Sequence, residues 1–270
     1  MSKRPDDPAG YLVDAKLALQ WGLGDHIFPT AIPLSLARLA SLQKWLELQS
    51  AVFPQKGVRA QLSELVGRLK QKTSWERKDF ERAVKSTGLS LAPPEDSEWR
   101  WCQAHRGHNS GGYSCALWLL FHTTLANSPR HVAPEALATI AEWVERFFGC
   151  EHCAQHFSEY YHTHGGADVR NGGQIGAVLW LWKAHNAVSH RLRHEELESE
   201  GSTFRATWPE HGDCEPCKNM TDPKAEWQSH NVFEYHQELY CFESDTYVCS
   251  GFDDTSQAKN SRHGNEKDEF

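Results

Sequence analysis

Cys150 and Cys153 form a Cys-x-x-Cys pair directly after Gly149. A helix that begins here carries one aromatic and imidazole face, made of Cys153, His156, Phe157, Tyr160, Tyr161 and His164. A thiol at a helix N-terminus is favoured as the thiolate, because free N–H groups and the helix dipole stabilise negative charge. Such a pair can also close a small disulfide that passes electrons to a neighbour by thiol–disulfide exchange. The pattern therefore indicates a redox centre.

A second Cys-x-x-Cys pair, Cys214 and Cys217, makes zinc the main alternative, because two such pairs supply four thiolate ligands. Zinc ribbons usually separate the halves by about 15–20 residues, whereas 60 residues lie between Cys153 and Cys214. The spacing favours redox chemistry and leaves zinc binding and structural disulfides open. The even total of eight cysteines suits a disulfide framework: Cys102, Cys115, Cys150, Cys153, Cys214, Cys217, Cys241 and Cys249.

Tryptophan and histidine recur at helical spacing in two further segments. Trp118 and His122 share a face with Cys115 and Leu125, and a later segment does the same with Trp182, His185, Ser189 and Leu192. A planar aromatic cofactor needs stacking faces and a few polar groups at its edge. Each residue alone is better explained by a Trp-rich core with hydrogen-bonded histidines at its margin. The three segments together favour a cofactor site.

Composition narrows the class of protein. The chain has 270 residues and a net charge of 28 − 36 = −8, which argues against nucleic acid as a partner. No apolar run reaches the roughly 18 residues of a membrane span. The first eight residues also lack the apolar core of a signal peptide.

Periodicity predicts an all-α chain whose regions are a loose tail over 1–10, a helix-rich region over 11–90, a linker, a Trp- and His-rich domain over 98–250 and a disordered tail over 251–270. In the first region we expect a helix over Tyr11–Leu23, and a second one with Pro33 in its first position and Leu36, Leu39, Leu42, Trp45 and Leu46 on one face. Val58, Leu62, Leu65, Val66 and Leu69 predict a third helix. Thr73 and Glu76 have capping-box spacing before a fourth helix, which carries Phe80 and Val84 and ends at Gly88. In the second region we expect helices over Ser114–Asn127, Pro134–Phe148, Glu151–His164, Gly173–Leu197 and Lys224–Tyr240.

Four motifs resemble a known family in order and approximate spacing: Gly112-Tyr-Ser-Cys-Ala-Leu-Trp-Leu-Leu-Phe-His122, Phe147-Phe-Gly-Cys-Glu-His-Cys-Ala-Gln-His-Phe157, Trp180-Leu-Trp-Lys-Ala-His-Asn-Ala-Val188 and Trp208-Pro…Cys214-Glu-Pro-Cys217. They look like the Erv-type domain of quiescin sulfhydryl oxidases. Residues from Tyr11 onward resemble the helix-rich region that precedes this domain. The resemblance spans about residues 10 to 220 and is most specific from 113 to 217.

The resemblance implies a helical bundle that binds FAD beside the Cys150–Cys153 disulfide. Cys153 would be the cysteine next to the flavin, and Cys150 the one that receives electrons. Structural disulfides would join Cys102 to Cys115 and Cys214 to Cys217, with a redox role as the alternative for the second pair. We expect a local disulfide between Cys241 and Cys249. The residues expected to line the cofactor are Trp118, His122, His152, His156, Trp182, His185, Asn186, Val188, Ser189, Arg205 and Trp208.

The implied activity is the oxidation of thiol pairs to disulfides, with electrons passed through FAD to oxygen to give hydrogen peroxide. The implied partners are reduced dithiols and oxygen. The family's thioredoxin domains have no counterpart in this sequence, so we expect either a piece of a longer protein or a form that relies on a separate thioredoxin-like carrier. An oxidising compartment, the secretory pathway, suits such an enzyme. Two departures, Gly111 in place of an arginine and Ser189 in place of an asparagine, remove groups expected at the cofactor. A zinc-binding interaction module and a flavin-binding domain without catalysis are the alternatives.

Overall fold

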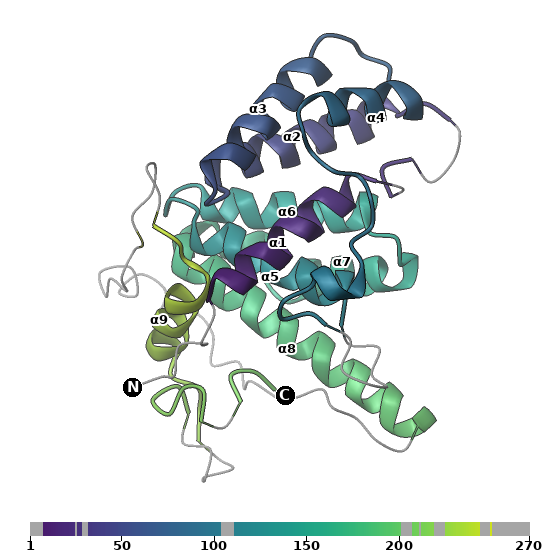
Figure 1. Ribbon diagram of the computed structural model, residues 1–270. Helices are drawn as coiled ribbons and strands as arrows, with labels where there is room; N and C mark the ends of the chain where they lie inside the picture. The colour runs from purple at the N-terminus through teal and green to yellow at the C-terminus, as the bar shows by residue number, and fades with distance from the viewer. Residues whose placement is uncertain are drawn as a thin grey trace.

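The computed structural model describes residues 8–24, 26–28, 32–103, 111–200, 207–210, 212–218, 225–243 and 249. Every regular element in these ranges is helical, which confirms the all-α prediction (Figure 1). No described helix combines the length and the apolar character that a membrane crossing requires. The α-helices are α1 (Pro8–Gly22), α2 (Leu36–Val52), α3 (Lys56–Leu69), α4 (Arg77–Ser86), α5 (Tyr113–Ala126), α6 (Ala133–Phe147), α7 (Glu151–Thr163), α8 (Gly173–Glu200) and α9 (Ser229–Tyr240), with short 3-10 helices η1 (Asp96–Glu98) and η2 (Gly166–Gly172).

Two helix starts differ from the sequence prediction. Helix α1 begins at Pro8, so the expected loose tail is too long by three residues; proline suits the first turn because its missing N–H has no intrahelical partner there. Helix α2 begins at Leu36 after Ser35, whose hydroxyl accepts from the backbone N–H of Arg38. Pro33 therefore precedes the helix, and Leu36 is 68% exposed rather than part of the buried face.

The predicted capping box before α4 is wrong. Glu76 is the N-cap residue, and no side chain caps the first turn. A capping box forms instead at Glu95 and Glu98 around η1. The last helix starts at Ser229 rather than Lys224. Helices α5, α6 and α7 lie within one residue of their predicted ends, and α8 extends three residues further than expected.

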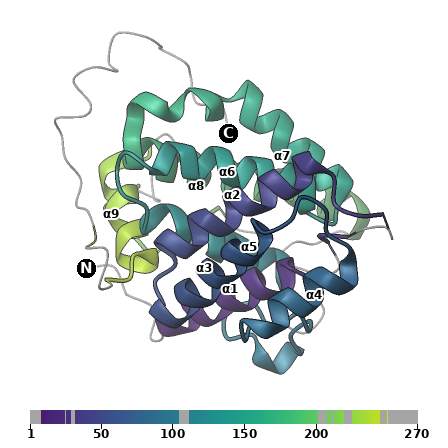
Figure 2. The same ribbon diagram turned by 90° about the horizontal axis from the view of Figure 1, so that it is seen from above.

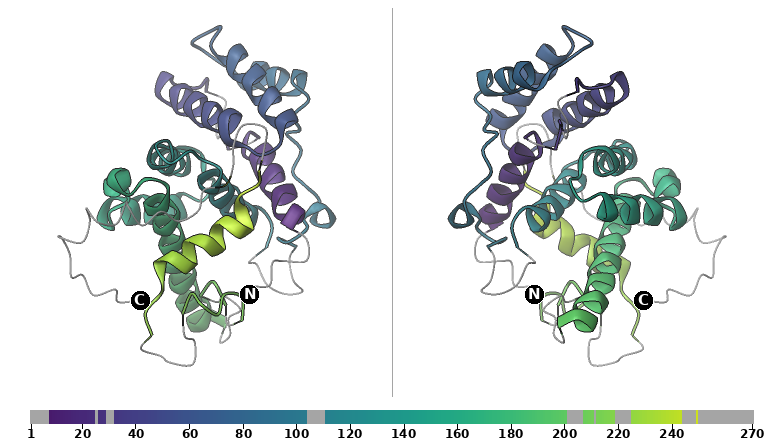
Figure 3. Two further views of the ribbon diagram at one scale, coloured as in Figure 1. Left: turned by 90° about the vertical axis from the view of Figure 1, so that its left-hand side faces the viewer. Right: turned by 90° about the vertical axis from the view of Figure 1, so that its right-hand side faces the viewer.

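Helices α2, α3 and α4 form a layer above the remaining helices (Figures 1 and 2). All five apolar positions of the α3 stripe are buried, as predicted. Helix α2 lies on α6, while α1 lies against α5 and α9 crosses α5 and α8 at the other side (Figure 3). A single buried apolar cluster runs through both the helix-rich region and the following helices. The domain boundaries expected from the sequence stay a prediction.

A buried carboxylate joins α1 to the start of the second region. Asp14 is fully buried, and its two oxygens accept from the consecutive backbone N–H groups of Arg100, Trp101 and Cys102 at 2.8, 2.8 and 2.9 Å. Cys102 is in turn bonded to Cys115 on α5. A carboxylate that accepts several backbone donors forms strong, charge-assisted hydrogen bonds. The Asp14 hydrogen bonds and the Cys102–Cys115 disulfide together therefore fix α1, the segment before α5 and α5 itself relative to one another.

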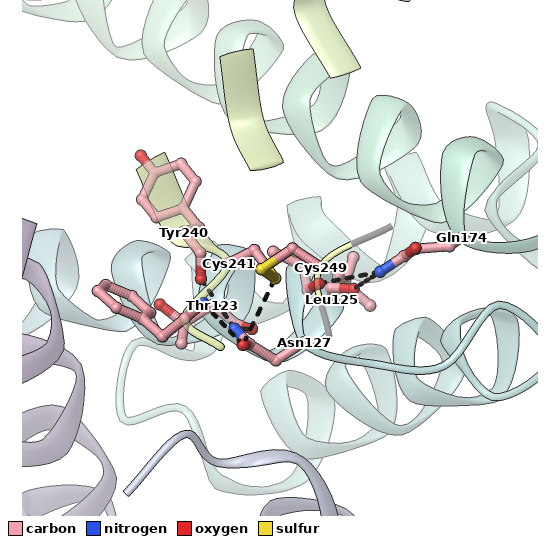
Figure 4. Close-up of a disulfide and its surroundings, with 9 residues drawn as sticks. Thr123, Leu125, Asn127, Gln174, Tyr240, Cys241 and Cys249 are labelled. Atoms are coloured by element: carbon pink, nitrogen blue, oxygen red, sulfur yellow. Dashed lines mark hydrogen bonds between the residues drawn. A yellow bond between two sulfur atoms is a disulfide. The ribbon is translucent and has the colours of Figure 1, made fainter. Parts of the chain in front are cut away.

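Helix α5 is buried on nearly every side, from Ala116 to Ala126 with only Trp118 partly exposed. Its C-terminal carbonyls are satisfied by side chains from other positions: Asn127 donates to the carbonyl of Thr123, and Gln174 donates to those of Leu125 and Ala126. Asn127 also donates to the carbonyl of Tyr240 and accepts from the N–H of Phe242 (Figure 4). One buried amide thus joins the ends of α5 and α9.

We expect Asp14→Asn to lower the free energy of unfolding by about 2–4 kcal/mol, since the amide replaces one acceptor oxygen with a donor that faces a backbone N–H. Urea denaturation followed by circular dichroism measures this. Asp79→Asn is the control, because Asp79 pairs with Lys72 and Arg82 at the surface, where ion pairs contribute little, and it should cost clearly less than Asp14→Asn. Equal effects of the two substitutions would contradict the role of Asp14.

Candidate active site

The pair Cys150 and Cys153 is a disulfide with an S–S distance of 2.04 Å at the N-terminus of α7. Cys150 is the N-cap residue, and its Sγ accepts from the backbone N–H of Cys153 at 3.2 Å. Both cysteines are partly exposed. A sulfur at this position stays in reach of solvent thiols, while the free N–H groups of the first helical turn stabilise the thiolate that forms when the disulfide opens.

His26 lies against the residue that precedes the disulfide, a position that the sequence did not indicate. A Cβ atom added to Gly149 would meet Nδ1 and Cε1 of the His26 ring at 2.5 Å, so a side chain at this position would collide with the ring. The loop that carries His26 is held by Arg38, whose guanidinium donates to the carbonyls of His26, Ile27 and Arg146. An imidazole from the helix-rich region therefore lies against the residue that precedes the cysteine pair.

Trp118 and His185 join α5 to α8. Their rings stack with centroids 4.2 Å apart and an interplanar angle of 5°. His122 Nε2 lies 3.1 Å from His185 Nδ1. Burial lowers the pKa of His122 well below its ordinary value, and the nearby His236 and His185 add to this effect. The buried imidazole is therefore neutral at physiological pH.

Trp208 is held to α8 through its own backbone. Asn186 donates to the carbonyl of Trp208 at 2.8 Å and accepts from its N–H at 2.9 Å. Trp182 Nε1 donates to the same carbonyl at 2.7 Å. Reciprocal amide bonds of this kind fix both the position and the orientation of a peptide unit. The indole of Trp208 consequently lies within 6.4 Å of the His122 ring, measured between centroids.

Helix α9 covers this group of rings, which the sequence analysis did not anticipate. Tyr240 stacks on His122 with centroids 5.0 Å apart, and His236 lies 5.3 Å from the same ring. Burial, as the largest cause, raises the pKa of Tyr240 and of Tyr235 and lowers that of His236 to about 4. In the sequence, the spacing of four residues between His236 and Tyr240 could have indicated that both side chains lie on one face of a helix. We name the group made of Trp118, His122, His185, Trp208, His236 and Tyr240 the ring cluster.

The ring cluster and the disulfide are connected through α7. The ring centroids of Trp118 and Phe157 are 6.1 Å apart. Phe157 lies on α7, one turn beyond Cys153. His152 and His156 also lie on α7, with their Nε2 atoms 3.1 Å apart. Val188 and Ser189 lie partly exposed on α8. The structure thus brings together six of the sequence-predicted residues, Trp118, His122, Trp182, His185, Asn186 and Trp208. Arg205 lies outside the described residues.

The remaining cysteines are paired within the chain. Cys214 is bonded to Cys217 and Cys241 to Cys249. The backbone N–H of Gln228, which precedes α9, donates to the carbonyl of Cys217 at 2.7 Å. Within the described part of the chain no cluster of three or more His, Cys, Asp or Glu residues suits a metal ion. Sulfurs that are bonded to each other cannot act as zinc ligands, so this pairing gives no support to the zinc alternative.

The ring cluster suits a flavin nucleotide. Its histidines His122 and His236 are buried and neutral, Trp118 and His185 are partly exposed, and His236 keeps an unpartnered Nε2. Neutral ring faces with a few polar edge atoms are what a planar aromatic cofactor requires. The residues present are therefore compatible with FAD.

Comparisons with known proteins agree with this geometry. Residues 115–209 match the Erv1 / Alr family. Sulfhydryl oxidase 1 of Cavia porcellus is 30% identical over 230 residues, which cover 80% of this chain and 36% of that protein. Sulfhydryl oxidase 2 of Homo sapiens is 31% identical over 156 residues, covering 53% and 21%.

A solved structure, the sulfhydryl oxidase fragment of human QSOX1, superimposes with a TM-score of 0.72 at 27% identity, covering 85% of this chain and 94% of that one. The chain spans about a third of the length of the Cavia porcellus relative and about a fifth of the human one. The matches thus lie in one region of longer proteins. The chain is similar to the sulfhydryl oxidases over most of its length, and its residues 115–209 match the Erv1 / Alr family.

Proposed function

We propose that the protein is a flavin-dependent thiol oxidase that converts dithiols to disulfides. The observation that carries this proposal is the Cys150–Cys153 disulfide at the N-terminus of α7, on the helix that reaches Trp118 through Phe157. A redox disulfide joined to an aromatic cofactor site is the arrangement that thiol oxidation requires. The names of the similar proteins support the same reaction.

Cys150 and Cys153 have different parts in the reaction. A substrate thiolate attacks Cys150 Sγ, the S–S bond breaks, and Cys153 leaves as a thiolate that the helix N-terminus stabilises. The second substrate thiolate then attacks the substrate sulfur of this mixed disulfide and releases Cys150 as a thiolate. The substrate gains one disulfide, and the cysteine pair gains two electrons.

Bound FAD would supply the acceptor for these two electrons and the route from the cysteine pair to oxygen, with hydrogen peroxide as the product. The residues proposed to hold it are Trp118, His122, His152, His156, Trp182, His185, Asn186, Val188, Ser189, Arg205 and Trp208. The indole of Trp118 offers an apolar face, and His122 remains neutral, so neither adds charge beside the ring system. Gly111 and Ser189 offer less polar contact than the family pattern, which lowers the expected affinity for the flavin.

The proposed substrates are reduced dithiols, the proposed carrier is a thioredoxin-like protein, and the proposed acceptor is oxygen. We also propose an oxidising compartment of the secretory pathway, because four disulfides join the eight cysteines of the chain and disulfides persist in such compartments.

The purified protein should be yellow, with roughly one FAD per chain. Trp118→Ala should weaken FAD binding roughly tenfold, because it removes a stacking surface. Trp101→Ala is the control, since this indole stacks on Tyr11 instead. Absorption spectra and titration of the apoprotein with FAD measure both effects. A colourless protein that takes up no FAD, or a protein that holds zinc instead, would contradict the proposal.

The two redox cysteines should give different spectra when each is replaced. Either Cys150→Ala or Cys153→Ala should abolish oxygen consumption with dithiothreitol, since the disulfide cannot form. Cys150→Ala should leave a Cys153 thiolate and show a long-wavelength charge-transfer band, whereas Cys153→Ala should show none. The band should fade on acidification at a pH below the free-thiol value of about 8.5. A band in Cys153→Ala alone would reverse the assignment.

Stability should depend on pH through the buried imidazoles. Burial lowers the folded-state pKa of His122 and His236 below the unfolded value of about 6.5. The free energy of unfolding is therefore undiminished above that pH and decreases as the pH falls, because the unfolded chain then binds more protons than the folded one. With a pKa of about 4, His236 should account for about 2 kcal/mol of the loss between pH 6.5 and 5. Urea midpoints of wild type and His236→Leu at both pH values check this. The same pH dependence in both proteins would contradict it.

A further inference from the structure

His236 of α9 is a fully buried residue of the ring cluster that lies outside the family match at 115–209. Its ring centroid is 5.3 Å from that of His122 and 4.9 Å from that of Trp208. Both of these neighbours are proposed to line the flavin. The side chain therefore borders the cofactor site from a helix that has no assigned role in it.

The hydrogen bonding of His236 fixes its tautomer. Nδ1 lies 2.8 Å from the backbone carbonyl oxygen of Val232. A carbonyl oxygen can only accept, so Nδ1 carries the hydrogen, and Nε2 of the neutral ring carries a lone pair. Nε2 is buried and has no hydrogen-bond partner among the described residues. A buried acceptor without a donor destabilises a protein, and such an atom in a native structure calls for a missing partner.

The neighbouring groups do not supply that donor. His122 already directs its Nε2 to His185 Nδ1 at 3.1 Å. Nε2 of His236 lies on the outer edge of the ring, while Nδ1 is directed back to the preceding turn of α9. The free lone pair is thus carried by the edge of the ring that does not contact the helix backbone.

We infer that His236 Nε2 accepts a hydrogen bond from an N–H or O–H group of the bound flavin dinucleotide. This inference rests on the proposed function. FAD carries such donors on its ring system, its hydroxylated chain and its adenine, and any of them would satisfy the lone pair. Helix α9 would then contribute a binding residue of its own, in addition to covering His122.

Three variants test the assignment with FAD as the probe. His236→Leu removes the acceptor and nearly keeps the volume. His236→Gln restores an acceptor oxygen near the position of Nε2. Gln237→Leu is the matched control, because Gln237 is also buried on α9 and both of its side-chain polar atoms lack partners. The affinity of each apoprotein for FAD and its thermal midpoint without FAD are measured.

We expect His236→Leu to bind FAD roughly tenfold more weakly than wild type, and His236→Gln to stay within about threefold. Without FAD, His236→Leu and Gln237→Leu should both melt roughly 2–4 °C higher, because each removes a buried unpartnered group. Gln237→Leu should keep the wild-type affinity for FAD.

Weaker binding by His236→Leu together with a higher apoprotein melting temperature separates a ligand contact from a merely structural role. Unchanged affinity in His236→Leu, or an equal loss in Gln237→Leu, would overturn the assignment and leave the proposed function intact. Failure of the wild-type protein to bind FAD would overturn both.

Discussion

The burial of α5 from Ala116 to Ala126 is the constraint on which the other helices depend. A helix this deeply buried must find partners inside the protein for most of the polar groups that it carries, because an unpaired buried group costs about 1–3 kcal/mol. Gln49 of α2 donates to the hydroxyl of Thr124, and His185 of α8 pairs with His122. Gln174 and Asn127 satisfy the carbonyls at its C-terminal end. Helices α2, α8 and α9 are therefore held in place by the polar groups of α5 as well as by apolar packing.

Local signals in the sequence predicted local structure well. The α3 stripe and the bounds of α5, α6 and α7 depend on periodicity within one helix, which the sequence shows directly. The predictions at Pro33 and at Thr73 were wrong. Proline at a first helical position and capping-box spacing indicate a helix start only where the chain actually turns into a helix at that residue. The paired Trp and His residues of α5 and α8 could be predicted as a common site, because their spacing placed each set on one helical face.

The contacts that the sequence did not reveal join residues that are distant along the chain. Asp14 binds amides 86 to 88 residues away, and His26 lies against Gly149. His236 meets His122 through the packing of α9, a helix whose apolar pattern is weak. No periodicity within one segment can show such pairs. The family match ends at 209, whereas the ring cluster around His122 also includes residues of α9.

The disulfide at the start of α7 encloses only two residues, and the backbone around it has its own hydrogen bond, from the N–H of Ala154 to the carbonyl of Cys150 at 2.9 Å. The entropy that a cross-link removes from the unfolded chain falls as the enclosed loop shortens, so this bond contributes less to folding than a long-range one. Thermodynamic linkage is reciprocal. Because this disulfide hardly changes the folding equilibrium, folding hardly changes the equilibrium between the disulfide and its two thiols. The oxidation state of the pair is consequently governed by its immediate neighbours rather than by the stability of the whole protein. In the proposed reaction, the pair would therefore open and close with little change in the stability of the helices around it.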